Sequence, residues 1–199
     1  MSKSKQHQIS EIIKCGKDPV YFMNKYLKIQ HPVKGLIPFK TYSFQDDCVK
    51  DFNDHRFNII LKSRQLGLST LVAAYSVWQA IFYKEKNILI IATKLAVAQN
   101  FIRKVKTYIK SMPKWLLVPA ITANNKQQVE FSNGSQIKAV PTSEDAGRSE
   151  ALSLLIVDEA AFVRNFDELW MGLYPTLSTG GRAILLSTPN GVGGQYHEI

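Results

Sequence analysis

The sequence predicts an α/β domain with a mostly parallel central sheet, helices on its flanks and an antiparallel hairpin insertion. From residue 57 onward, short apolar runs typical of buried strands alternate with longer amphipathic runs typical of helices. This alternation favours right-handed crossovers that place helices on both faces of the sheet. One segment instead alternates apolar and polar residues around Asn133-Gly134, which is the strongest short signal for a hairpin.

The first forty residues are predicted to be basic and largely irregular. Lysine recurs there without a clean apolar face, and only residues 20–27, after Pro19, indicate a short helix. The chain is then broken by Pro32, Gly35 and Pro38. We therefore divide the chain into a basic N-terminal lead-in, residues 1–40, and a folded domain, residues 41–199.

The domain is built from predicted strands and helices in alternation. Four apolar runs are predicted to be fully buried strands, at residues 57–61, 87–92, 152–157 and 183–187. Amphipathic runs predict helices at residues 69–82, 95–111 and 166–177. The hairpin is predicted over residues 129–140, before the third of these strands.

Composition narrows the class of protein. The 199 residues include 25 Lys and Arg against 16 Asp and Glu, a formal net charge of +9, which favours a polyanionic partner. Cys15 and Cys48 are too few for a disulfide scaffold or a structural zinc site, so a reducing compartment is expected. The sequence has neither the roughly 18 consecutive apolar residues of a membrane helix nor a signal-peptide core. We expect a soluble intracellular protein with no membrane partner.

A candidate phosphate-binding loop follows the first predicted strand. A short loop that ends in Gly and leads into a helix opened by a hydroxyl residue wraps backbone N–H groups around a phosphate. Compared with G-x-x-x-x-G-K-[ST], Lys62 stands where the first Gly belongs and Leu68 where the Lys belongs. The cation near the phosphates would be Lys62 or Arg64, and Ser69 keeps the position that coordinates Mg²⁺. The other residues of the loop are Ser63, Gln65, Leu66, Gly67 and Thr70.

Two adjacent carboxylates end the strand predicted at residues 152–157. Asp158 and Glu159 would lie at the carboxyl edge of the sheet, where ligands bind in open α/β folds. Asp158 would hold Mg²⁺, and Glu159 would orient and deprotonate an attacking water. A phosphate loop and an Asp-Glu pair, each after a buried strand, would rarely occur together by chance.

Three further features fit the same site. Hydroxyl residues at the end of the last strand, Ser187 and Thr188 before Pro189, could sense the loss of a γ-phosphate. Upstream of the loop, Gln45 could read an adenine edge, with Tyr42 as a stacking aromatic. Arg148 lies in a polar loop, from which an arginine in a ring of ATPases can reach the neighbouring subunit's nucleotide.

Together these segments resemble the ATPase half of a tailed-bacteriophage terminase large subunit, a motor that packages DNA through the capsid portal. The matching segments are residues 18–22, 38–45, 63–67, 133–135, 157–162 and 187–191. The resemblance implies a P-loop NTPase of the RecA/ASCE-like type that uses ATP and Mg²⁺. It places Gln45 at the adenine motif, Asp158 at magnesium and Glu159 as the catalytic carboxylate, and it assigns coupling of hydrolysis to movement to Ser187, Thr188 and Pro189.

The resemblance also bears on the loop cation and on the partners. Some terminases carry the lysine at the start of the loop, which favours Lys62, with Arg64 as partner or alternative. The implied partners are double-stranded DNA, the portal protein and the terminase small subunit, with a homo-oligomeric ring on the procapsid in the host cytoplasm. The nuclease domain and the small subdomain that follow the ATPase in this family have no counterpart here, so we expect no nuclease activity.

Two other functions remain open. A superfamily-2-type helicase or translocase lobe also joins a glutamine motif, a phosphate loop and an Asp-Glu pair. It needs a second ATPase-like lobe, however, and usually keeps the loop lysine that Leu68 replaces. A hydrolysis-deficient nucleotide-binding assembly protein would have no need of Glu159.

Overall fold

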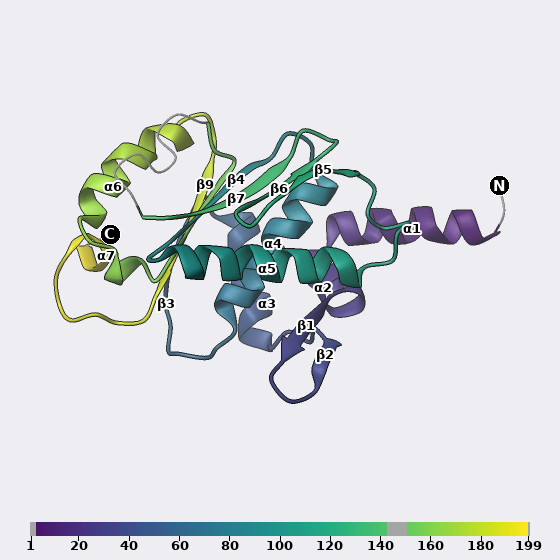
Figure 1. Cartoon of the computed structure of the whole chain (residues 1–199), viewed down its shortest axis with the longest axis horizontal. Coiled ribbons are helices and arrows are strands. Elements are labelled where there is room, and N and C mark those ends of the chain that lie inside the picture. The colour runs from purple at the N-terminus through teal and green to yellow at the C-terminus, as the bar shows by residue number, and fades with distance from the viewer. Residues whose placement is uncertain (1–2, 143–150, 199) are drawn as a thin grey trace.

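A seven-stranded sheet forms the centre of the chain in the computed structural model, which describes residues 3–142 and 151–198 (Figure 1). The strands are β3 (Phe57–Leu61), β4 (Asn87–Ala92), β5 (Ile121–Asn124), β6 (Gln128–Phe131), β7 (Gln136–Pro141), β8 (Leu154–Asp158) and β9 (Arg182–Ser187). Their order is β3-β9-β8-β4-β7-β6-β5, in which only the β7–β6 and β6–β5 pairs are antiparallel. The predicted fold class is therefore confirmed, with the hairpin added to one end of the sheet.

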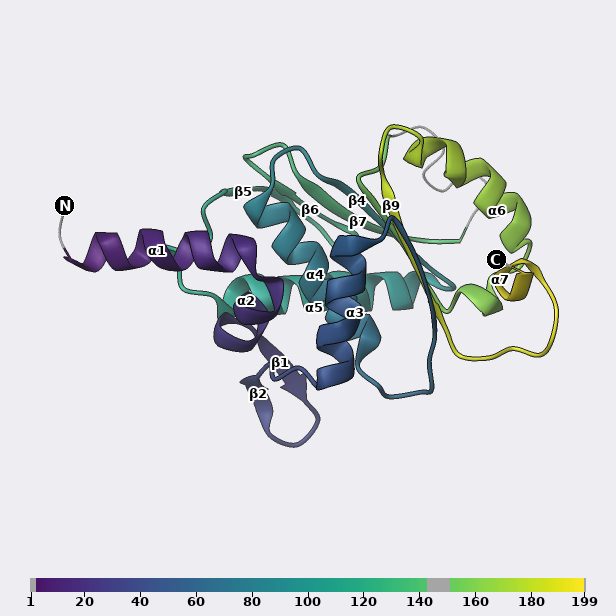
Figure 2. The same ribbon diagram turned by 180° about the vertical axis from the view of Figure 1, so that it is seen from behind.

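Helices cover both faces of this sheet. The helices are α1 (Lys3–Lys17), α2 (Pro19–Tyr26), α3 (Ser43–Asp54), α4 (Leu68–Phe82), α5 (Leu95–Ser111), α6 (Phe166–Leu173) and α7 (Gln195–Glu198), with short 3₁₀ turns at Ala160–Phe162 and Tyr174–Leu177. Two views from opposite sides show α1 projecting at one end of the molecule and α6 and α7 at the other (Figures 1 and 2). No described helix is long and apolar enough to cross a bilayer.

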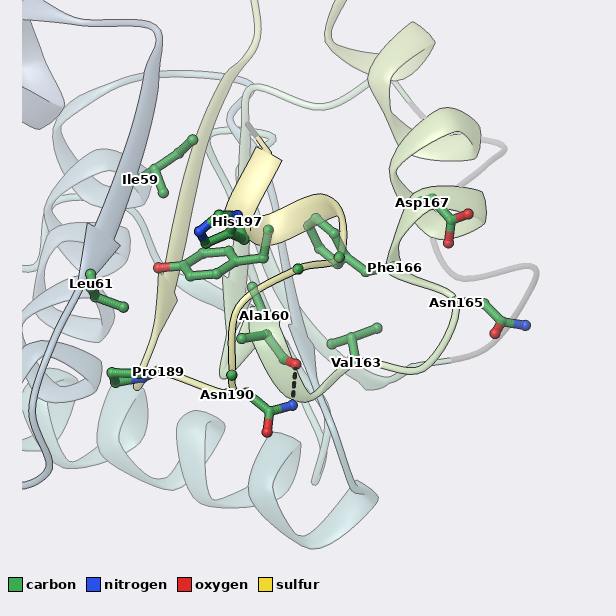
Figure 3. A pocket seen from close by; sticks show the side chains of 15 residues that line it. Ile59, Leu61, Ala160, Val163, Asn165, Phe166, Asp167, Pro189, Asn190 and His197 are labelled. Carbon is green, nitrogen blue, oxygen red and sulfur yellow. Dashed lines mark hydrogen bonds between the residues drawn. The ribbon is translucent and has the colours of Figure 1, made fainter.

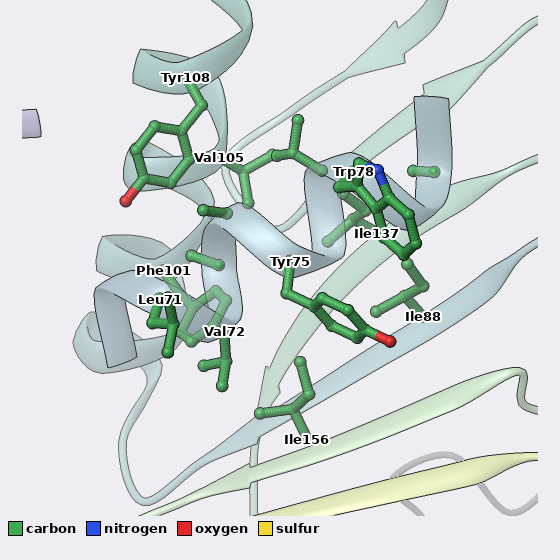
Figure 4. Packing of buried hydrophobic residues seen from close by; sticks show 14 of the residues in the cluster. Leu71, Val72, Tyr75, Trp78, Ile88, Phe101, Val105, Tyr108, Ile137 and Ile156 are labelled. Atoms are coloured by element: carbon green, nitrogen blue, oxygen red, sulfur yellow. The ribbon is translucent and has the colours of Figure 1, made fainter. Parts of the chain in front are cut away.

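Alternate residues of the inner strands enter two separate cores. Ile88 and Ile90 of β4 belong to the larger core, which α4 and α5 complete, whereas Leu89 and Ile91 belong to the smaller core under α6. In the larger core, the rings of Tyr75 and Trp78 of α4 stack on each other and lie over the strands (Figure 4). Because both sides of these strands are covered, they read as continuous apolar runs in the sequence.

β3 is not the fully buried strand that its sequence predicts. It is the edge strand of the sheet, and Phe57, Ile59 and Leu61 are 40%, 41% and 67% exposed. An apolar run reports the propensity to form a strand, but it does not report whether another element covers that strand.

The first forty residues are also more regular than predicted. α1 is a 15-residue helix, α2 begins at Pro19 after an Asp18 N-cap, and β1 (Lys28–His31) pairs antiparallel with β2 (Gly35–Pro38). The sequence does not predict α1 because Ile9 and Ile13 are exposed, so the helix has no continuous buried apolar face. Its buried residue Cys15 accepts a hydrogen bond at its carbonyl from Trp78 of the larger core.

Candidate active site

Three neighbouring strand ends bring the predicted residues together at one edge of the sheet. β9 lies between β3 and β8, with Ser187 beside Leu61 on one side and Leu186 beside Asp158 on the other. The backbone N–H of Lys62 donates to the carbonyl of Ser187 at 2.9 Å, which extends this register by one residue. The residues that follow these three strands therefore start from adjacent positions.

Lys62 and Glu159 form an ion pair across this edge. Lys62 Nζ lies 2.8 Å from Glu159 Oε1, and the Lys62 side chain is only 8% exposed. Burial acts to raise the pKa of Glu159, but the hydrogen bond and charge of Lys62, together with the Thr188 donors, outweigh it and lower that pKa. Glu159 is thus held as a carboxylate, and by this pairing it is a weak base.

The backbone at Glu159 has the left-handed conformation, with φ 57° and ψ 45°. For a residue with a Cβ this conformation costs roughly 1–2 kcal/mol, and such strain is concentrated at functional sites. The turn directs the side chain back toward Lys62 and away from the path of β8.

The segment after β9 is hydrogen-bonded to the segment after β8. Thr188 donates to Glu159 Oε2 from its hydroxyl at 3.2 Å and from its N–H at 3.4 Å. Ser187 Oγ accepts from the N–H of Ala161 at 3.1 Å, and Asn190 donates to the Ala161 carbonyl at 2.8 Å. A displacement of the Glu159 side chain would therefore act directly on Thr188, one of the residues predicted to couple hydrolysis to movement of DNA.

Asp158 is buried beside the first turn of α4. Burial raises its pKa, while a hydrogen bond from Ser69 and the charge of Lys62 partly offset that rise. A buried carboxylate next to a hydroxyl offers the hard oxygen donors that Mg²⁺ prefers, so these residues fit the expected ion. Among residues 3–142 and 151–198 no group of three or more His, Cys, Asp or Glu could hold a metal ion.

The phosphate loop is shaped by two left-handed residues and by α3. Gln65 and Gly67 have φ of 65° and 72°, and Gly67 is the N-cap of α4. Gln45 Nε2 donates to the carbonyl of Leu66 at 2.8 Å, and Gln45 Oε1 accepts from the N–H of Tyr42 at 3.2 Å. A Cβ at Gly67 would meet Gln45 Nε2 at 2.9 Å, so the glycine is needed for both space and conformation.

The other predicted loop residues differ in exposure. Leu68, which stands at the usual lysine position, is buried in the larger core, and Arg64 is exposed and unpaired within the described chain. Tyr42 is 67% exposed and stacks on Phe44 at 5.7 Å between ring centroids. Ser63 is exposed, and Thr70 is half-buried. The predicted trans arginine, Arg148, lies outside the described residues.

Glu159 and the two expected magnesium ligands, Ser69 and Asp158, line an open pocket of about 620 Å³ together with residues that the sequence analysis did not identify. The pocket reaches from Ser69, Asp158 and Glu159 across to one side of α5. The α5 residues on its wall are Val97, Asn100, Phe101, Arg103, Lys104, Thr107 and Tyr108. A signal for Lys104 exists in the sequence, because it lies three residues after Phe101 and four before Tyr108, on a stripe that is otherwise apolar.

A second pocket, of about 480 Å³, lies on the other side of the coupling segment (Figure 3). It is formed by the exposed face of β3 at Ile59 and Leu61, the turn at Pro189 and Asn190, and α7. Of the catalytic candidates that the structure describes, Lys62, Arg64 and Glu159 do not line this pocket. Pro189 therefore lies between the ion-paired site and this second pocket, whose lining is of mixed polarity.

Comparison with known families identifies one sequence match. The family described as "Terminase large subunit, T4likevirus-type, N-terminal" matches residues 59–199 of this chain. The matched part begins within β3 and contains the phosphate loop, the Asp-Glu pair and the coupling segment.

Solved structures share the fold. The chain is similar to the large terminase of bacteriophage HK97, with a TM-score of 0.71 and 16% identity, over 89% of this chain and 38% of that one. It is similar to the large terminase of a thermophilic bacteriophage in complex with ATP-gamma-S, with a TM-score of 0.53 and 12% identity, over 75% and 38%. It is also similar to the UvsW helicase of bacteriophage T4, with a TM-score of 0.57 and 16% identity, over 86% and 59%. The chain spans about two fifths of the length of these terminases.

Proposed function

This chain belongs to the terminase large subunit family, and from that premise we propose that it is a motor domain that hydrolyses ATP to drive double-stranded DNA into a viral procapsid. The observation that carries the proposal is the convergence of Lys62, Glu159 and Thr188 at three adjacent strand ends, beside a helix N-terminus and a buried aspartate. In this set Lys62 would bind phosphate, Glu159 would be the base for water, and Thr188 would move with Glu159 through its hydrogen bonds to that carboxylate.

Binding of ATP would change the partner of Lys62. The buried ammonium of Lys62 lies at the start of the phosphate loop, so phosphate oxygens would compete with Glu159 for it. Backbone N–H groups at the start of α4 add a positive field for the same anion. We assign phosphate binding to Lys62 because the exposed Arg64 makes no hydrogen bond or ion pair to any described residue that would hold it in the loop.

Loss of the Lys62 contact would make Glu159 a stronger base. Its pKa is lowered by that contact, and release would let the pKa rise toward its ordinary value. Glu159 would then accept a proton from the water whose oxygen attacks the γ-phosphorus, as the bond to ADP breaks. In this scheme the base becomes active only after nucleotide has taken its partner.

Mg²⁺, held by Asp158 and Ser69 through oxygen donors, would neutralise charge on the phosphates when it is bound. Thr188 would follow the change at Glu159, because both of its donors point to Glu159 Oε2. The hydrogen bonds of Ser187 and Asn190 to Ala161 would carry the change into the segment at Pro189.

Several partners follow from the family rather than from the site. We propose duplex DNA, a portal protein and a terminase small subunit as partners, and a ring of subunits in which Arg148 acts on a neighbour. The phage large terminase in complex with ATP-gamma-S supports nucleotide binding by this fold, and the net charge of +9 supports a polyanion. Host cytoplasm is the proposed location, because packaging motors work there.

The fold does not separate a terminase from a helicase, since the UvsW helicase shares it. The family match favours the terminase. A test is to measure phosphate release by the chain with and without blunt duplex DNA, alongside strand separation of a labelled forked duplex, with Asp158→Asn as the inactive control. We expect hydrolysis that depends on magnesium, is raised by duplex DNA and separates no strands. Separation of the DNA strands would show that the chain is a helicase lobe instead. Nucleotide binding without hydrolysis would show that it is a nucleotide-binding assembly protein.

A further inference from the structure

Lys104 is a partly buried cation that faces the pocket of the catalytic residues. It lies on α5, which packs against α4, and it lines the same pocket wall as Asn100 and Thr107. Across the pocket are Ser69, Asp158 and Glu159. α5 supplies none of the motifs found in the sequence, so its contribution to the site rests on this geometry.

Within residues 3–142 and 151–198, no hydrogen bond or ion pair holds the Lys104 ammonium. The ion pairs within the described residues are Lys25 with Glu11 and Lys62 with Glu159, and no hydrogen bond from Lys104 accompanies them. α5 contains no Asp or Glu that could pair with it along the helix. Burial lowers the pKa of Lys104, the charge of Asp158 raises it, and the charge of Lys62 lowers it further. Lys104 thus feels the charge of Asp158 across the pocket but forms no ion pair with it, which leaves the ammonium placed to receive an anion.

We propose that Lys104 binds the terminal phosphate of the nucleoside triphosphate and so distinguishes the triphosphate from the diphosphate. The terminal phosphate must face Glu159, which is the base for the attacking water, and Lys104 lines the pocket together with Glu159 and Asp158. A diphosphate ends one phosphate earlier and would leave Lys104 unengaged. The proposal rests on the proposed function, because a nucleotide must first occupy the phosphate loop.

The test is calorimetric titration of ADP and of ATPγS, with MgCl₂ present, into the wild-type chain and into three variants. Lys104→Met keeps the length of the side chain without its charge, and Lys104→Arg keeps the charge. Lys110→Met makes the same change on an exposed residue of the same helix, outside the pocket. Thermal unfolding of each variant separates loss of binding from loss of fold.

We expect Lys104→Met to weaken the binding of ATPγS by about tenfold or more, which is the effect of one charge-assisted hydrogen bond. The affinity of this variant for ADP should stay within about threefold of wild type. Lys104→Arg should restore most of the difference, and Lys110→Met should bind both nucleotides like wild type. The melting temperature of Lys104→Met should not be lower than that of wild type, because the burial of an ammonium opposes folding.

Equal weakening of ADP and ATPγS, or wild-type affinity for both, would overturn the role of Lys104 and leave the proposed function standing. A Lys104→Met variant that melts earlier and keeps the wild-type affinity ratio would show a structural role instead, and this too overturns the proposal. If the wild-type chain binds neither nucleotide, the proposed function fails and the role of Lys104 fails with it.

Discussion

The lysine at the start of the phosphate loop has surroundings that its sequence motif does not reveal. Lys62 is buried and paired with Glu159, whereas Arg64, two residues on, is exposed. A buried cation is retained in a fold when a charged partner or ligand needs it, because desolvation otherwise opposes its burial. The contrast between these two neighbours is the physical reason to assign phosphate binding to Lys62.

Substitution of each cation separates their roles. Lys62→Ala should lower the rate of ATP hydrolysis by at least about 100-fold, since removal of a charge that stabilises the transition state has an effect of this order. Arg64→Ala should stay within about threefold of wild type. Phosphate release at saturating ATP and magnesium measures both. Wild-type turnover by Lys62→Ala, or loss of turnover in Arg64→Ala alone, would move the assignment to Arg64.

The contacts of Gln45 favour a role in holding the phosphate loop over a role in recognising adenine. It is only 2% exposed, and both ends of its amide are engaged, with the loop carbonyl of Leu66 and with the backbone of Tyr42. Gln45→Ala should therefore weaken binding of ATPγS and GTPγS by the same factor, about fivefold, through loss of one hydrogen bond to the loop. Calorimetric titration of both nucleotides is the measurement. Weakening of ATPγS alone would show that Gln45 reads adenine, as its motif predicts.

The residue types of the site were predictable, but their pairing was not. Asp158 and Glu159 follow an apolar strand and so indicate a sheet edge, and Gly67 indicates a tight turn. The contact between Lys62 and Glu159 joins residues 97 positions apart, and it depends on β9 lying between their strands. Lys104 was not predicted because it belongs to no motif, although a lysine in an apolar stripe is itself a signal.

At the scale of elements, the sequence predicts the bounds of most inner strands and long helices to within about two residues. The predicted helix at 95–111 has the observed bounds of α5, because its buried and exposed faces differ strongly. The elements that the sequence did not predict are α1, β1, β2, α3, β5 and α7. Two of them, α1 and β5, lack a clear buried face in the structure, with Ile9, Ile13 and Ile121 exposed. The predicted helix at 166–177 is α6 as far as Leu173, and it continues as a 3₁₀ turn that contains Pro175.

α1 and α2 are joined by one carboxylate. Glu11 on α1 accepts hydrogen bonds from Tyr21, Lys25 and Tyr26 of α2, and the hydrogen bonds of Lys25 and Tyr26 are the main causes that lower the pKa of Glu11 from 4.5 to about 2. A lowered pKa in the folded state means that the ionised form stabilises the fold above about pH 4.5 and that this stabilisation is lost as the pH falls toward 2.

Glu11→Gln should therefore lower the free energy of unfolding at pH 7, and its difference from wild type should shrink below pH 4.5. Urea unfolding from pH 7 down to the lowest pH at which the chain stays folded measures this. Asp47→Asn, on an exposed residue of α3, should show no such trend. A difference that stays constant with pH would mean that the ionised carboxylate of Glu11 does not join the two helices.

At the scale of the whole molecule, the net charge of +9 and the proposed packaging role together predict how duplex DNA would bind. A motor that moves any sequence must hold the phosphate backbone and not the bases. Such binding releases counter-ions, so affinity falls steeply as salt rises.

Fluorescence anisotropy with two labelled duplexes of unrelated sequence tests this. Affinity should fall by about tenfold or more between about 50 and 200 mM NaCl, and the two sequences should agree within about twofold. A strong preference for one duplex, or binding that does not depend on salt, would contradict backbone recognition.

The central claim is that Glu159 is the base for hydrolysis at a site completed by Lys62 and Thr188. The direct measurement compares phosphate release by wild type and Glu159→Gln at saturating ATP and magnesium with duplex DNA present, with Glu168→Gln, on an exposed residue of α6, as control. We predict a rate at least about 100-fold lower in Glu159→Gln, with ATPγS binding retained and the control unchanged. Equal rates in wild type and a folded Glu159→Gln variant would contradict the account.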